Sequence, residues 1–500
     1  MNKIKIGWSE ASLVPEGRKV NLAGQFYERI TDVVETPITV TAMAIECGSD
    51  SAIFCSCDLV STSKHLLDSV RARLSGIKDF PLDKVMISAI HTHTAPGYAK
   101  RGDSSSMSGS TLDVLTQLMP NVKYEKLVSY EGDDLLDGNE AHAFMADRIA
   151  EAAKIAWDNR TEGMYAQGFG RAAVGMCRRV CYSDGSAKMW GDTDTATFTE
   201  LEGGNDSGIE MLFTFTPEKK LTGVIANVAC PAQVLEHRSF ISSDYFGKVK
   251  ALIRREFGDD VYLLGLCSAA GDQCPRDMIR WVEPETPIDD PNIVRGEVTK
   301  RKADPSMFDI KGCELIGRRI ANEIFFAYEG IADDEYVSET ELEHRNITID
   351  MPLRRVTPED KEKALRAIEE FAAKVGDGTI NFNDNARMHV HAGTVVRSQI
   401  QEKVDVIPIE VHIIRLGNIA FATNPYELFL DYGNQIRARS KASQTFLIQL
   451  SCGCYGYLPT EKAEKGSHYS AYVSSGTTGH VGGNLLVRKT VSEINDMLKK

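Results

Sequence analysis

The sequence has no run of lysine and arginine, and its 57 basic residues are outnumbered by 71 acidic ones, which gives a formal net charge of -14. Proteins that bind nucleic acids or anionic membrane surfaces gather basic side chains to neutralise phosphates. We therefore expect no nucleic-acid partner and no anionic membrane surface as a partner. The acidic balance is typical of a soluble protein.

Long apolar segments are also missing. The N-terminal stretch MNKIKIGWSEASLVPEG has no apolar core and no small-residue cleavage site, so it does not resemble a secretory signal. The most apolar later stretch, 261–270, is too short to cross a bilayer, so no transmembrane segment is expected. We predict a cytoplasmic location.

The 11 cysteines lie mostly in apolar runs of a 500-residue chain, which argues against the disulfide framework of a small secreted domain. Reduced thiols are expected. Cys55, Cys57, Cys452 and Cys454 form two C-x-C pairs, which raises the alternative of a structural zinc site. Each pair lies in or beside a strand-like run, and buried core thiols are the favoured interpretation.

Strand-like and helical segments alternate without an internal repeat, which predicts an α/β fold with a mixed sheet. We expect one catalytic domain over residues 1–500, with an N-terminal part at roughly 1–330 and a C-terminal part at roughly 331–500. Capping residues and amphipathic spacing predict helices within 62–76, 243–258 and 357–375.

Two stretches are predicted to be long loops. Residues 101–138 are rich in Ser, Gly and Asp, and residues 282–305 are rich in Pro, Glu and Asp. Loops of this length are usually functional or disordered, so they are either lids over a pocket or solvated surface segments.

Five apolar, strand-like runs each end in a cluster of unusual polar residues. In α/β sheets, ligands bind beyond the carboxyl ends of the strands. We therefore expect the five clusters to converge on one pocket. They occupy residues 91–98, 231–237, 271–276, 424–427 and 455–460.

His91 and His93 are two residues apart, and such residues on a strand share a face. Both imidazoles could bind one metal, or one could bind while the other transfers protons. Zinc bound by imidazole nitrogen and carboxylate oxygen ionises a bound water near neutral pH, which makes it a nucleophile. The alternative is a pair of hydrogen-bonded turn histidines.

Four residues outside the histidine pair are further candidates. Glu427 could be a carboxylate ligand, or an acid in the first turn of a helix. Tyr457 could bind metal or donate to a developing oxyanion, or be an ordinary half-buried tyrosine. Arg178 and Arg179 could stabilise negative charge, or form a surface ion pair.

The stretch HTHTAPGY at 91–98 resembles the histidine motif of the neutral ceramidases, zinc hydrolases that cleave the amide bond of ceramide. Further resemblances follow in the family's order over nearly the whole chain. They are the stretches VGMCR at 174–178, GDQCPR at 271–276, NPYE at 424–427, YGYLPT at 455–460 and HY at 468–469.

This resemblance implies roles for individual residues. His91, Glu427 and Tyr457 would bind zinc, and His93 would accept and donate the proton. Arg178 and Tyr469 would hold the substrate carbonyl or stabilise the oxyanion. Asp272, in the stretch GDQCPR, is counted among the expected catalytic residues.

The departures from the family pattern bear on function. Pro231 stands where the family has a zinc-binding histidine, and proline cannot bind zinc. His237 is the favoured replacement and Cys230 a second candidate, while a lost or changed metal is the third possibility. Cys274 replaces a family serine, which suggests either a thiolate nucleophile or a small residue in a tight turn. The sequence is expected to lack the family's C-terminal immunoglobulin-like domain.

The sequence therefore predicts a ceramidase-like hydrolase that uses Zn²⁺, or another divalent metal, to cleave an N-acyl amide bond. The expected partner is a small N-acylated molecule, soluble or amphiphilic, and ceramide itself is a doubtful substrate. Two alternatives stay open: a hydrolase with Cys274 as its nucleophile, and a non-catalytic ligand-binding protein on the same fold. The oligomeric state stays open too.

Overall fold

Three β-sheets form the centre of the protein, in a computed structural model that describes residues 1–25, 28–98, 107–124, 130, 132–280 and 309–499. The first sheet has the order β18 (Glu339–Thr340), β1 (Asn2–Ser12), β4 (Thr39–Cys47), β5 (Asp50–Cys57) and β6 (Val85–Ala89), with β8 (Thr161–Glu162) also paired to β1. The second has the order β16 (Tyr262–Cys267), β15 (Leu221–Val228), β14 (Gly208–Phe215) and β9 (Met164–Arg171). The third has the order β19 (Leu342–Pro352), β21 (Val406–Leu416), β22 (Ile419–Thr423) and β24 (Gln444–Ile448).

Each sheet is antiparallel except for one parallel pair. The pairs are β5 with β6, β15 with β16, and β22 with β24. The five apolar runs singled out in the sequence are β6, β15, β16, β22 and β24, so all of them lie in these parallel pairs. The mixed α/β architecture is the predicted one. Parallel pairing places the polar ends of β15 and β16 side by side, and likewise those of β22 and β24.

The remaining strands are short and form small sheets around the three large ones. They are β2 (Val20–Asn21), β3 (Ile30–Thr31), β7 (Lys123–Tyr124), β10 (Met176–Cys177), β11 (Arg179–Tyr182), β12 (Ala187–Met189), β13 (Phe198–Leu201), β17 (Gln273–Cys274), β20 (Thr379–Ile380), β23 (Glu427–Leu428) and β25 (Tyr457–Leu458). Two of these small pairings hold site residues: β10 with β17, and β23 with β25.

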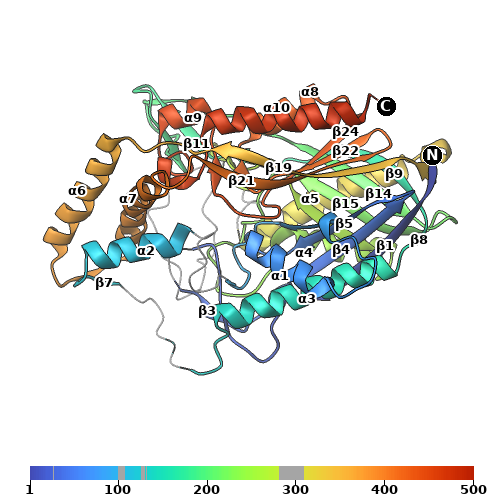
Figure 1. The fold of residues 1–500 in the computed structure, drawn as a ribbon, viewed down its shortest axis with the longest axis horizontal. Helices are drawn as coiled ribbons and strands as arrows, with labels where there is room; N and C mark the ends of the chain where they lie inside the picture. The colour runs from blue at the N-terminus through green and yellow to red at the C-terminus, as the bar shows by residue number, and fades with distance from the viewer. Residues whose placement is uncertain (26–27, 99–106, 125–129, 131, 281–308, 500) are drawn as a thin grey trace.

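Helices cover the outer faces of the sheets (Figure 1). The third sheet is covered by α8 (Leu430–Arg439) and α10 (His480–Met497), and the first by α1 (Lys64–Leu74) and α3 (Gly138–Asp158). The second sheet packs against α4 (Asp244–Phe257) and α5 (Asp309–Glu329). The short α9 (Glu461–Gly466) follows β25. Among the described residues, we find no helix that combines the length and apolar character needed to cross a membrane.

The three predicted helices form, and two of them have an N-cap side chain that accepts a hydrogen bond. The Ser63 side chain accepts a hydrogen bond from the Leu66 N–H at the start of α1, and Gly258 ends α4. In α6 (Pro358–Val375), Thr357 and Asp360 form a reciprocal capping box in front of a proline at the first position. These local signals were sufficient because each cap satisfies backbone groups that the helix itself leaves without partners.

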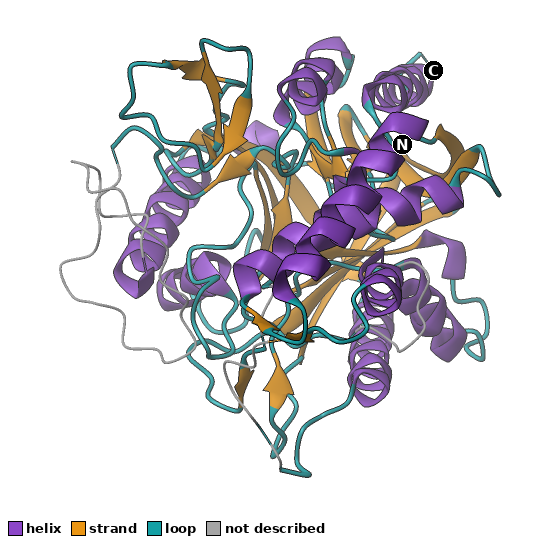
Figure 2. Ribbon diagram, turned by 90° about the vertical axis from the view of Figure 1, so that its left-hand side faces the viewer, coloured by secondary structure: helices purple, strands orange, loops and turns teal. Residues whose placement is uncertain are grey.

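A separate group of helices stands at one end of the molecule. It consists of α2 (Met107–Leu118), α6 and α7 (Phe382–Ile400), which share their own apolar core (Figure 1). Figure 2 looks onto this end, with helices in front of the strands. The predicted loop at 101–138 is partly wrong, because it contains α2, whose Leu115 is buried in that core. The predicted loop at 282–305 lies outside the described residues.

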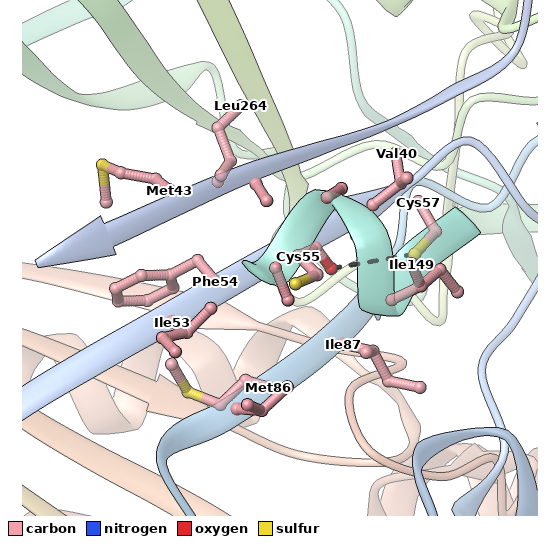
Figure 3. Close-up of a cluster of buried hydrophobic side chains, with 14 of the residues drawn as sticks. Val40, Met43, Ile53, Phe54, Cys55, Cys57, Met86, Ile87, Ile149 and Leu264 are labelled. Carbon is pink, nitrogen blue, oxygen red and sulfur yellow. Dashed lines mark hydrogen bonds between the residues drawn. The ribbon is translucent and has the colours of Figure 1, made fainter. Parts of the chain in front are cut away.

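The largest apolar core joins the two parts of the chain. It contains residues of β1, β4, β5 and β6 together with Phe421 and Phe446 from the third sheet. Figure 3 shows Cys55 and Cys57 within this core, among aliphatic and aromatic side chains. Both thiols are free and buried, and burial raises the pKa of each. The interpretation of this C-x-C pair as core thiols is confirmed.

Candidate active site

The carboxyl ends of the three parallel strand pairs meet at one place. Buried Asn227, near the end of β15, donates hydrogen bonds to the main-chain carbonyls of Leu266 in β16 and Leu447 in β24. The Ser451 hydroxyl donates to the Ile87 carbonyl in β6. The polar clusters that follow these strands are therefore neighbours, as the sequence predicts.

Seven side chains from these clusters form a closed ring of polar contacts. Polar atoms of six consecutive pairs lie 2.8–3.5 Å apart, and a hydrogen bond between Tyr457 and Glu427 closes the ring. In order around the ring they are His91, His93, Glu236, Gln233, Arg178, Tyr457 and Glu427. Six of the seven are buried or nearly so, and Glu236 is the most exposed, at 24% of its side chain.

His91 is held in a defined orientation. Its Nδ1 lies 2.5 Å from the Val60 carbonyl, and because a carbonyl can only accept, Nδ1 carries the hydrogen. With its hydrogen on Nδ1, a neutral imidazole would present the lone pair of Nε2, which lies 3.3 Å from His93 Nε2 and 3.5 Å from Glu427 Oε2. In that form His91 Nε2 and Glu427 Oε2 are both acceptors, and a proton or a cation between them would stabilise the pair.

The two imidazoles converge, but not through strand alternation. The strand β6 ends at Ala89, and His91 has a φ of +69°, a conformation that is costly for a residue with a side chain. A turn held by the Leu59 carbonyl, which accepts from the His91 and Thr92 N–H groups, brings the rings together. The two imidazoles are close together, as the sequence predicts, but a turn and not strand alternation brings them there.

His93 is enclosed on the side away from His91. Its Nδ1 lies 3.4 Å from Glu236 Oε2, and fully buried Arg29 donates to its carbonyl at 2.6 Å. Gly24 has a φ of +95°, and a Cβ at this position would lie 2.6 Å from His93 Cγ, so only glycine fits there. Burial, His91 and Arg29 hold the pKa of His93 well below its ordinary value, so the ring is neutral and can accept a proton.

Glu427 and Tyr457 are cross-strand neighbours in the β23–β25 pair. Burial alone would raise the pKa of Glu427, but its neighbours His91, Arg178 and Tyr457 hold it below its ordinary value. The carboxylate is thus ionised at neutral pH. Burial, followed by the nearby Glu427 and Tyr469, raises the pKa of Tyr457 well above its ordinary value.

Arg178 lies between β10 and β11 and extends its guanidinium into the ring. It donates to Gln233 Oε1 at 3.2 Å, to the Gly271 carbonyl at 3.1 Å and to Tyr457 Oη at 3.3 Å. Burial opposes its charge, but the neighbouring Tyr457 and Glu427 raise its pKa overall. A fixed cation therefore faces the centre of the ring.

Arg179, the next residue, is equally buried and points the other way. It forms a bidentate ion pair with Glu202 at 2.7 and 2.9 Å. It also donates to the carbonyls of Ser467 at 2.8 Å and of Tyr469 at 3.0 Å. Neighbouring Ser470 has a φ of +69° and Ser467 a φ of +61°, so Arg179 stabilises a strained loop that presents Tyr469. The Tyr469 ring lies 5.6 Å from that of Tyr457.

Asp272 and Cys274 lie beside the segment that carries Arg178, and their backbone bonds hold it in place. Asp272 Oδ1 accepts from the Leu430 N–H at 2.9 Å, its carbonyl accepts from the Arg178 N–H at 2.9 Å, and burial raises its pKa to about 6. Cys274 is fully buried in β17, its thiol donates to the Arg276 carbonyl at 3.2 Å, and burial raises its pKa to about 11. The thiol is therefore protonated at neutral pH.

The segment after β15 contributes Glu236 to the ring, beside the predicted ligand His237. Burial lowers the pKa of His237 to about 4, and its charged neighbours are Glu236, Arg276, Arg238 and Arg29. Cys230 is fully buried, and burial raises its pKa well above the ordinary value. Sequence reasoning assigned no role to Glu236 or Gln233, because an irregular segment has no periodicity that tells which side chains point inward.

One compact group of possible metal ligands lies outside the ring, among the residues that the structure describes. Ligand atoms of Glu410, His412 and Cys452 all lie within 4.8 Å of one another. However, Arg71 donates to both oxygens of the Glu410 carboxylate, which already balances its charge. His412 Nε2 lies 2.8 Å from Glu410, and His344 Nε2 lies 2.9 Å from His412 Nδ1. This arrangement fits a buried hydrogen-bond network.

Comparison with known proteins gives a fold but no sequence relative. No family model matches the chain, and no curated protein matches it either. Among solved structures, a neutral ceramidase from Pseudomonas aeruginosa matches 99% of this chain and 75% of its own, at 17% identity and a TM-score of 0.66. A ceramidase complexed with C2 matches 100% of this chain and 76% of its own, at 14% identity and a TM-score of 0.65. The chain has the fold of the neutral ceramidase structures, and the fold expected from the resemblance is confirmed.

Proposed function

We propose that the chain is a metal-dependent hydrolase that cleaves an amide bond, most simply an N-acyl bond, at the ring centred on His91. The observation that carries the proposal is the orientation of His91. Its Nδ1 hydrogen is committed to the Val60 carbonyl, so its Nε2 lone pair faces Glu427 Oε2 at 3.5 Å. The shared fold with structures described as ceramidases supports amide hydrolysis.

The donors around this point fit a divalent metal. His91 Nε2, Glu427 Oε2 and Tyr457 Oη are an imidazole, a carboxylate and a phenol, and three protein ligands leave a place for water in a catalytic zinc site. The carbonyl bonded to His91 Nδ1 is the outer contact that metal-binding histidines usually have. Zinc, or another divalent metal, held here would polarise a substrate carbonyl and lower the pKa of a water molecule.

The other ring residues supply proton transfer and charge stabilisation. His93 is neutral, so it can take a proton from the attacking water and return it to the departing amine. Glu236 lies beside His93 Nδ1 and stabilises the imidazolium that exists between these two proton transfers. Arg178 and Tyr469 stabilise the negative charge that develops on the carbonyl oxygen. His237 has no role in this scheme.

The geometry favours this mechanism over a cysteine nucleophile. A catalytic thiol needs a depressed pKa and access to substrate. The Cys274 thiol has neither, because it is fully buried and its pKa is raised to about 11. A binding protein without turnover is separated from the hydrolase by the experiment below.

The decisive experiment is elemental analysis of the purified protein after zinc loading, beside His91→Ala and His389→Ala. His389 is a half-buried histidine of α7 that bonds Thr111, so it controls for loss of one imidazole elsewhere. We expect about one metal per chain in the wild type and in His389→Ala, and none in His91→Ala. Cleavage of N-acyl substrates should stop on chelation and return with metal.

Absence of metal from every loaded sample would refute the mechanism. Stoichiometric metal without cleavage of any amide would identify a binding protein on this fold.

A further inference from the structure

A cavity of about 890 Å³ opens beside the ring, between the separate helical group and the segment that follows β25. We call it the Tyr469 cavity, because Tyr469 both lines it and contacts Tyr457 of the ring. Its volume is typical of small-molecule sites, which span roughly 300–1,000 Å³. Tyr469 is thus a side chain shared by the cavity and the surroundings of the ring, and a substrate held by both would pass it.

The lining of the Tyr469 cavity is rich in charges of both signs. Arg354, Lys363 and Arg387 are its cations, and Asp360 and Glu464 are its anions. Most of these charges already have partners. Glu464 bonds the His480 main chain and ring and lies 3.7 Å from Arg354, while Lys363 and Arg387 pair with acids on their own helices. A ligand with a large net charge of either sign is therefore not favoured.

Carbon atoms provide much of the cavity surface, but most of them belong to polar or charged side chains, and the aliphatic side chains are few. They are Ala364, Ala386, Val390 and Val473. An alkyl chain placed here would cover charged and polar groups without bonding them, which is unfavourable. A hydroxylated ligand would instead exchange hydrogen bonds with them.

Neutral hydrogen-bonding groups complete the lining. His468 Nδ1 accepts from the Met189 N–H at 3.1 Å, so its neutral ring carries the hydrogen on Nε2 as a donor. His391, Thr394, Ser467 and Tyr472 line the cavity as well. The cavity thus offers donors and acceptors in mixed order, which suits a ligand with several hydroxyl groups.

We propose that the Tyr469 cavity binds the amine portion of the substrate, and that this portion is hydroxyl-rich and uncharged, as in an N-acylated amino sugar. The proposal rests on the proposed amide hydrolysis. It places selectivity in the helical group, and the bond cleaved at the ring is that between the acyl carbon and the nitrogen of this amine. Water supplies the hydroxyl of the released acid and a proton of the released amine.

The test compares three substrates: N-acetylglucosamine, N-acetylglutamate and N-acetylsphingosine. It uses the wild type, Ala386→Trp, which fills the cavity from α7, and Ala373→Trp, the same change at an exposed position of α6. We expect the wild type to have its highest kcat/KM for N-acetylglucosamine. Ala386→Trp should lower that value at least about tenfold, mainly by raising KM, and Ala373→Trp should leave it unchanged.

The outcomes separate this proposal from the one on which it rests. If the wild type binds metal but hydrolyses no amide, the proposed function fails. If it prefers N-acetylsphingosine or N-acetylglutamate, or if Ala386→Trp behaves as Ala373→Trp does, hydrolysis stands and the cavity proposal is wrong. Val390→Phe is a milder filling variant in case Ala386→Trp does not fold, and an unchanged KM in that variant would also overturn the proposal.

Discussion

Replacing Arg179 by methionine should destabilise the protein strongly, although Arg179 is not a member of the polar ring around His91 and takes no direct part in the proposed reaction. The change removes the cation from a pair in which the arginine side chain is 0% and the Glu202 side chain 5% exposed. It also removes the donors to the Ser467 and Tyr469 carbonyls. The carboxylate of Glu202 is then left buried without its counter-charge.

The size of the effect follows from this burial. Removing one partner of a buried ion pair costs about 3–5 kcal/mol, because the other charge stays desolvated. The double variant Arg179→Met/Glu202→Gln removes the charge itself. We expect it to be more stable than the single variant by at least about 1 kcal/mol, and with Glu202→Gln and the wild type a double-mutant cycle gives the coupling energy.

The assay is equilibrium unfolding in urea, followed by tryptophan fluorescence at neutral pH. Arg366→Met is the control, because Arg366 pairs with Glu362 at the exposed surface of α6, and such pairs contribute little. The reasoning is refuted if Arg179→Met loses less than about 1 kcal/mol, or if the double variant is less stable than the single one. A lowered kcat in the variant would further support its role in presenting Tyr469.

Three more predictions follow from the site and its surroundings. Glu236→Gln should lower kcat by about 10- to 100-fold with little change in KM, because the carboxylate at His93 Nδ1 is lost; an unchanged rate would exclude that role. Cys274→Ser should retain activity within about tenfold, and iodoacetamide should not inactivate the wild type; rapid inactivation lost in the variant would restore the cysteine mechanism. Burial opposes the charge on His412, but Cys452 and Glu410 raise its pKa above 6.5, so its stabilising effect should be full below pH 6.5 and decline as pH rises through the folded-state pKa. His412→Gln should therefore cost more stability in acidic than in alkaline urea titrations, and an equal loss at both would contradict the assignment.

The sequence predicted those parts of the fold that local signals determine. Ser63, Thr357 and Gly258 mark helix ends through bonds within a few residues, and the structure shows these helices. The five strand ends were visible because each apolar run stops abruptly at polar residues. Helix α2 was missed because its stability comes from packing Leu115 against α7, while its own residues favour loops.

The sequence predicted that several residues of the candidate site lie near one another, but it did not predict their detailed geometry. The convergence of His91, His93, Glu427 and Arg178 followed from strand ends and from the resemblance, and the structure brings these four together. The inward position of Glu236 depends on an irregular segment, whose path is set by distant contacts such as Arg29 donating to the Glu236 carbonyl. Such contacts leave no periodic signal in the sequence.

The opposite directions of Arg178 and Arg179 also limit how this chain can evolve. Substitutions can accumulate on the surface around β10 and β11, but the number of residues in the segment that holds Arg178 and Arg179 cannot change by one. A single deletion there would reverse which side chains point to each face. One guanidinium would then remain for two contacts on opposite sides, with Tyr457 and with Glu202. We therefore expect homologues to tolerate insertions and deletions elsewhere in the outer loops, while the length of this short segment stays fixed.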